Sequence, residues 1–126
     1  MAQRGSTGAR QSVKTGAVAE WLAIAFLTLK GYRMLSRRYG GKGGEIDLIA
    51  RRGNAIIFVE VKARAVMADA ATAITPEKIR LVNRRIRDWC ARNPWASGLT
   101  LRADAIFFGG SVWPRHVEGI FPVEML

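Results

Sequence analysis

Two β-rich runs, at residues 45–51 and 55–62, are separated by Gly53-Asn54, a dipeptide typical of tight turns. This spacing predicts a β-hairpin with a two-residue loop. The cross-strand partners on one face are then all apolar: Ala50 with Ile57, Leu48 with Val59, and Ile46 with Val61. A four-residue loop would shift the pairs by two but keep the same residues on each face, because side chains alternate along a strand. One face of the hairpin must therefore be buried.

The opposite face of this hairpin brings two carboxylates together. Asp47 faces Glu60, and Lys62 lies two residues further along the same face. Like charges across a strand pair are destabilising, so a compensating charge or a retained proton is needed. Lys62 is one compensator, and an oxygen-binding cation such as Mg²⁺ or Mn²⁺ is another. Such a cation polarises a phosphodiester and activates a water, while an ammonium stabilises the developing negative charge.

A plainer interpretation stays open for the same residues. Glu-x-Lys on an exposed sheet face is typical of a solvated surface, and Glu45 opposite Lys62 would then be an ordinary cross-strand ion pair. The distribution of acids favours the first interpretation, since Glu45, Asp47 and Glu60 gather on one hairpin of a basic chain. Phe58 on their face indicates partial cover, which makes uncompensated carboxylates costly.

The charge balance indicates the class of partner. The chain has 20 Lys and Arg against 10 Asp and Glu, a net charge of +10 over 126 residues. This favours a polyanion, nucleic acid first and acidic lipid second, because cations placed at phosphates release counterions. The single cysteine, Cys90, excludes an internal disulfide and a cysteine-rich zinc site, which fits a cytoplasmic protein. The longest apolar run, 17–29, contains Glu20 and is shorter than the about 20 residues of a membrane span, so we expect no membrane association.

The chain divides into an arm and one domain. Residues 1–15 lack apolar periodicity and predict a disordered basic arm, whereas residues 16–126 are long enough for a single core. Helices are expected at 16–30, ended by Gly31, and from a Thr75 cap to Asn93. Further strands are expected at 32–38, 99–108 and 117–121, and residues 40–44 form a glycine-rich loop.

Two stretches of the hairpin, GEIDLIA at 44–50 and FVEVKAR at 58–64, resemble the YraN-like family of small bacterial proteins. That family is similar to the PD-(D/E)XK nuclease superfamily, especially its archaeal Holliday-junction resolvases. The resemblance covers about residues 16–121 and implies an α/β fold with a mixed central β-sheet flanked by helices, the restriction-endonuclease-like core. It also implies a divalent-metal-dependent endonuclease acting on DNA, branched or single-stranded, and a homodimer where two strands of a junction are cut.

The resemblance assigns roles to individual residues. Asp47 and Glu60 would be metal ligands, assisted by the Val61 carbonyl, and Lys62 would orient or activate the attacking water. Glu20 matches a helical acid near the metal in that superfamily, with a solvated helix carboxylate as the alternative. Relatives carry a further acid just after the glycine at position 16, and its absence here leaves Glu20 as the only helical acid. Arg102 and Asp104 match an Arg-x-Asp motif and are expected to form a supporting ion pair.

Several cations are candidates for phosphate contacts. Arg80, Arg84 and Arg87 cluster on one flank of the helix that Thr75 caps, while Lys78, Arg85 and Arg92 line the other flank. The residues that we expect to bind nucleic acid are Lys78, Arg64, Arg80, Arg84 and Arg87, with an ordinary surface lysine as the alternative for Lys78. We expect Cys90 in the core and His116 in a structural or exposed position.

Two other functional classes remain. A nuclease fold can serve as a nucleic-acid-binding module with little or no catalysis, because fold does not determine function. The chain could also be an accessory interaction protein whose cations only confer solubility. Salt-dependent DNA binding that ignores EDTA indicates the first class, and absence of DNA binding indicates the second.

Overall fold

A mixed five-stranded β-sheet forms the middle layer of the computed structural model, which describes residues 3–41, 46–63, 74–109 and 113–125. Its strands follow the chain in the order β1-β2-β3-β4-β5, and only the β3–β4 pair is parallel. The elements within these ranges are α1 (Gln3–Leu29), β1 (Arg33–Tyr39), β2 (Ile46–Arg52), β3 (Ala55–Lys62), α2 (Pro76–Arg92), the 3₁₀ helix η2 (Pro94–Ala96), β4 (Thr100–Phe107) and β5 (Arg115–Phe121). The α/β class and the mixed sheet are as predicted.

The β2–β3 hairpin confirms the predicted register. Leu48 pairs with Val59 and Ala50 with Ile57, around a turn in which Gly53 has a φ of 60°. This left-handed conformation is the one that a tight hairpin turn needs and that glycine adopts without strain. Ile46 departs from the prediction: the β2–β3 register ends at Leu48, and Ile46 packs with the core on the α2 side instead.

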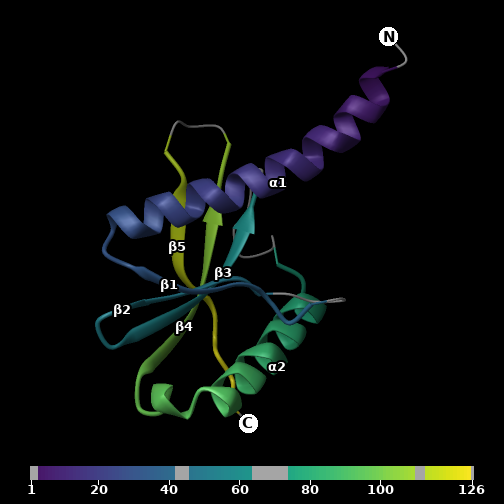
Figure 1. Cartoon of the computed structure of the whole chain (residues 1–126). Coiled ribbons are helices and arrows are strands. Elements are labelled where there is room, and N and C mark those ends of the chain that lie inside the picture. The colour runs from purple at the N-terminus through teal and green to yellow at the C-terminus, as the bar shows by residue number, and fades with distance from the viewer. Residues whose placement is uncertain (1–2, 42–45, 64–73, 110–112, 126) are drawn as a thin grey trace.

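The two helices cover opposite faces of the sheet (Figure 1). On one face, Ala23 and Leu27 of α1 pack against the apolar face of the hairpin. On the other face, Val82, Ile86 and Trp89 of α2 pack around Phe58. Because β3 and β4 are parallel, α2 serves as the crossover connection between them.

The ends of both helices have identifiable causes. Thr75 caps α2, accepting the Lys78 N–H at 3.2 Å, and Pro76 occupies its first turn, as predicted. Gly31, with a φ of 93°, ends α1. α1 begins at Gln3, upstream of residue 16, where the helix was expected to begin.

Two further predictions concern a membrane span and the glycine-rich loop. Within the part of the chain that the structure describes, we find no helix with the length and apolarity that a membrane span requires. Most of the predicted glycine-rich loop, together with Glu45 and Arg64, lies outside the described residues.

A buried ionic network joins β4, β5 and the end of α1. The Asp104 side chain is fully buried and accepts hydrogen bonds from Arg102 Nε and Nη2 at 2.8 and 2.9 Å, from His116 Nε2 at 2.8 Å and from the Gly119 N–H at 3.0 Å. His116 Nδ1 lies 2.7 Å from Lys30 Nζ, so the partners imply the neutral Nε2–H tautomer. The expected Arg102–Asp104 pair and the structural role of His116 are confirmed.

This network predicts a large loss of stability on substitution. Asp104→Ala removes the buried acceptor that Arg102, His116 and the Gly119 N–H share, so the free energy of unfolding should fall by about 3–5 kcal/mol. Urea denaturation of the variant measures this loss. Arg115→Ala, at an exposed site on β5, is the control and should stay within about 0.5 kcal/mol of the parent. Equal stability of the two variants would show that the network contributes nothing.

Candidate active site

The hairpin places Asp47 and Glu60 together on the sheet face that α2 covers. Just beyond the last paired residues of β2 and β3, Asp47 Oδ2 accepts the Val61 N–H at 2.7 Å. The Asp47 carboxyl is also hydrogen-bonded to Glu60, whose side chain is only 11% exposed. Two carboxyl groups can share a hydrogen bond only if one keeps a proton. The convergence that the register predicted is therefore present, and we call Asp47 and Glu60 the carboxylate pair.

The surroundings of the carboxylate pair raise the pKa of Asp47 to about 8. Burial is the largest cause, and the hydrogen bond and negative charge of Glu60 add to it. The Val61 N–H and the charge of Lys78 act in the opposite direction but do not outweigh these effects. At neutral pH the pair consequently carries one proton where it could instead hold a cation.

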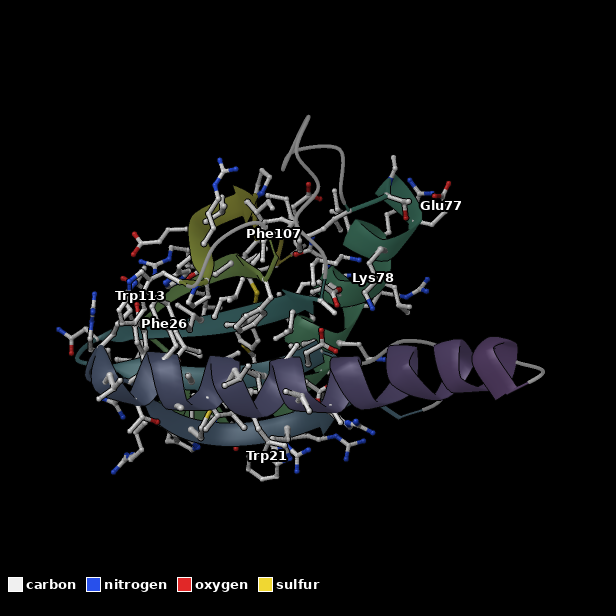
Figure 2. All side chains as sticks on the ribbon, turned by 90° about the horizontal axis from the view of Figure 1, so that it is seen from above. Trp21, Phe26, Glu77, Lys78, Phe107 and Trp113 are labelled. Atoms are coloured by element: carbon white, nitrogen blue, oxygen red, sulfur yellow. The ribbon has the colours of Figure 1, made fainter. Side chains whose placement is uncertain are left out.

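Lys78 supplies positive charge to the pair from α2. Its Nζ lies 3.3 Å from Glu60 Oε2, and its side chain is half-buried. Figure 2 shows Glu77 and Lys78 at the N-terminal end of α2. The Thr75 cap fixes the backbone of this first turn, so it also positions Lys78 against Glu60. Lys78 was predicted to contact a phosphate. Its ion pair with Glu60 was not predicted, because it joins residues from separate elements.

Lys62 and Val61 occupy the end of β3 beside the pair. Alternation along the strand puts Lys62 on the face of Glu60, and the Lys62 carbonyl accepts the Phe108 N–H at 2.9 Å, which fixes the strand end. Val61 contacts Asp47 through its N–H, and its side chain packs with the core on the α1 side.

Glu20 does not join this group. Its carboxylate lies 3.1 Å from Arg38 Nε and 3.6 Å from Arg37 Nη2, so it neutralises β1 arginines. Among the residues that the structure describes, no three His, Cys, Asp or Glu side chains are arranged to hold a metal ion. The carboxylate pair still fits Mg²⁺, which commonly binds through one or two carboxylates and keeps several waters. The role of Glu20 near a metal therefore stays a prediction.

The arginines on the predicted binding flank of α2 have varied surroundings. Arg80 forms an exposed ion pair with Glu77 at 3.7 Å, and Arg87 Nη1 donates to the Glu124 carbonyl at 2.8 Å. Arg84 is exposed. The flank therefore presents cations at the surface, but Arg87 also ties α2 to the C-terminal segment.

Comparison with known proteins identifies the family. The model of a family described as "Uncharacterised protein family UPF0102" matches residues 19–108, which include the carboxylate pair, Lys62 and Lys78. A UPF0102 protein of Methylobacterium radiotolerans is 50% identical over 122 residues, 97% of this chain and 95% of the relative. A relative from Methylorubrum extorquens is 56% identical over 111 residues, 88% of this chain and 87% of the relative, and one from Mesorhizobium japonicum is 43% identical over 121 residues, 96% and 97%. Since the family model covers most of the chain and the relatives match it nearly end to end, this protein belongs to the UPF0102 family.

Proposed function

We propose that this protein is a divalent-metal-dependent endonuclease that hydrolyses phosphodiester bonds in DNA, built on a restriction-endonuclease-like core of the PD-(D/E)XK type. The observation that carries the proposal is the carboxylate pair, two largely covered acids whose mutual influence and burial raise the pKa of Asp47 to about 8, on a chain of net charge +10. Buried titratable groups with strongly perturbed pKa values and specific charge partners are typical of functional sites.

Each residue at the site has a separate role in the proposed reaction. Asp47 and Glu60 would hold Mg²⁺ or Mn²⁺ in place of their shared proton, and the Val61 N–H keeps the Asp47 carboxylate oriented. When bound, the ion would polarise the phosphate and lower the pKa of a coordinated water. Lys62, on the same sheet face, stabilises negative charge or positions the attacking water. Lys78 offsets the charge of Glu60 and attracts the substrate.

A second candidate is a nucleic-acid-binding module with little or no catalysis. Two observations favour it: Lys78 already neutralises Glu60, and Glu20 is occupied by β1 arginines. In this case, DNA binding would depend on salt but be unaffected by EDTA and by substitution of Asp47. The experiments below separate the two candidates.

Substitution of the carboxylate pair tests catalysis. Asp47→Asn and Glu60→Gln keep the shape of the side chains but remove the charges that would hold the cation, so nicking of branched DNA with Mg²⁺ or Mn²⁺ should fall by about 100-fold or more. Lys62→Ala should cause a comparable loss. Gel assays of labelled junctions and linear duplexes measure the rates, with EDTA as a further arm.

The matched control is Glu124→Gln, which removes an exposed carboxylate and should cleave at the parental rate. Equal cleavage by all variants would indicate a contaminating nuclease. DNA binding without cleavage by the parent would favour the second candidate.

The raised pKa of Asp47 predicts an unusual dependence of stability on pH. In the folded protein Asp47 stays protonated up to about pH 8, whereas in the unfolded chain it ionises near pH 3.8. Between these values the folded state binds more protons, so the contribution of Asp47 to stability falls as pH rises, by at most about 1.4 kcal/mol per pH unit. Urea denaturation in EDTA at several pH values should show a slope that Asp47→Asn removes.

Divalent cations provide the complementary measurement. At pH 8 and above, Asp47 loses its proton, so Mg²⁺ or Mn²⁺ should stabilise the parent protein by compensating the two negative charges, and Asp47→Asn should not respond. Identical pH slopes for the parent and Asp47→Asn would refute the shared-proton interpretation.

A further inference from the structure

A polar groove lies between the end of β1 and α2, and the chemistry proposed above does not use it. Its volume is about 460 Å³, and it is lined by Tyr39, Gly40, Arg85, Asp88 and Arg92. Arg85 and Arg92 lie on the predicted flank of α2 that also holds Lys78, opposite Arg80, Arg84 and Arg87. We call this feature the arginine groove.

The arginine groove is organised by one carboxylate. Tyr39 Oη donates to Asp88 Oδ2 at 2.6 Å, and Arg92 Nε lies 3.4 Å from Asp88 Oδ1. The hydrogen bond from Tyr39 lowers the pKa of Asp88, so its carboxylate stays ionised and holds both partners. Asp88 carries one negative charge against the two guanidinium groups of Arg85 and Arg92, so these three side chains have a net positive charge.

The arginine groove continues the charge of the carboxylate pair along α2. Lys78, Arg85 and Arg92 are spaced by seven residues, almost two helical turns, so they lie along one flank; we call them the cationic stripe. At about 1.5 Å per residue, neighbouring members are about 10.5 Å apart along the helix axis. A duplex strand rises about 3.4 Å per nucleotide but also winds around its axis, so the straight stripe can meet only a short run of phosphates on one side of the duplex. Lys78 stands at Glu60, where cleavage is proposed.

We propose that the arginine groove binds the phosphodiester backbone of the substrate strand, with Arg85 and Arg92 contacting phosphates on one side of the phosphate at the carboxylate pair. This inference rests on the proposed function, because it assigns the path of the substrate to that site. Arginine suits the task since its planar fork makes two hydrogen bonds to one phosphate. Gly40, with a φ of 114°, borders the groove without a side chain that would narrow it.

The opposite flank of α2 is less suited to this role. Arg80 pairs with Glu77, and Arg87 donates to the Glu124 carbonyl. Neither flank is free of internal contacts, but only the cationic stripe includes a residue that touches the carboxylate pair. A strand bound along the stripe therefore passes the catalytic groups, which is the geometric requirement for cleavage.

The test measures DNA binding by the full-length protein without metal. Fluorescence anisotropy of a short labelled DNA duplex in EDTA should show about tenfold weaker binding for Arg85→Ala and for Arg92→Ala, independent of sequence. The slope of log K against log salt should fall by about one for each arginine removed. Arg85→Lys should retain part of the affinity, because the charge remains while the fork is lost.

Two variants serve as comparisons. Arg115→Ala removes one exposed charge from β5 and should bind like the parent. Arg84→Ala removes an exposed charge next to Arg85 in sequence but on the other flank, and its effect should be clearly smaller. If Arg84→Ala weakened duplex binding as much as Arg85→Ala, net charge alone would explain the binding. This result would overturn the assignment of the arginine groove.

Inorganic phosphate and a mononucleotide distinguish a strand from a small anion. If either saturates the groove at low concentration and Arg85→Ala abolishes that binding without weakening the duplex, a small-ligand site replaces the proposed one. Unchanged duplex affinity in Arg85→Ala and Arg92→Ala, combined with loss of cleavage in Asp47→Asn, would refute the groove and leave the proposed nuclease intact. Absence of both DNA binding and cleavage in the parent would refute both.

Discussion

Two carboxyl groups held together under partial cover set the main constraint on this structure. Asp47 and Glu60 can share a buried face only if a proton or a cation lies between them, because two negative charges in such surroundings repel each other and lose their hydration. The fold places two groups beside the pair that favour ionisation of Asp47, the Val61 N–H and the Lys78 ammonium. Neither is sufficient to ionise Asp47 at neutral pH. At neutral pH the site is thus left one positive charge short, and the proposed metal binding rests on this deficit.

A second buried carboxylate shows the contrast. Burial opposes ionisation of Asp104 as well, but hydrogen bonds from His116, Arg102 and the Gly119 N–H lower its pKa below the usual value. The same sheet therefore contains one carboxylate that is fully compensated and one that is not. Full compensation fits a structural role, since nothing further is needed for stability. Incomplete compensation at Asp47 fits a site that receives its charge from a ligand.

The parts of the structure that could be predicted from the sequence are local. The register of the hairpin followed from its turn and from the alternation of apolar residues, and the Thr75 cap followed from the residues around it. For the hairpin and the cap, neighbouring residues determine the geometry, so periodicity and spacing are sufficient. The Arg102–Asp104 pair was expected from the family resemblance, on its Arg-x-Asp motif.

The features that sequence reasoning missed depend on tertiary packing. Glu20 meets Arg37 and Arg38 because α1 packs beside β1, and nothing near Glu20 in the sequence signals that approach. His116 lies between Asp104 and Lys30, and Lys30 is 86 residues away from it in the sequence. Contacts between side chains of different helices and strands can be identified only in the three-dimensional structure.

The packing of α2 connects the core to the charges on its surface. Val82, Ile86 and Trp89 are buried against the sheet, and the Trp89 ring meets Phe58 edge to face at 5.5 Å. These contacts fix the rotation of the helix about its axis, so every other residue on it has a fixed direction. The cationic stripe therefore has a set position relative to Glu60, which lies two residues from Phe58 on β3. Hydrophobic burial in this way determines where a bound polyanion would meet the carboxylate pair.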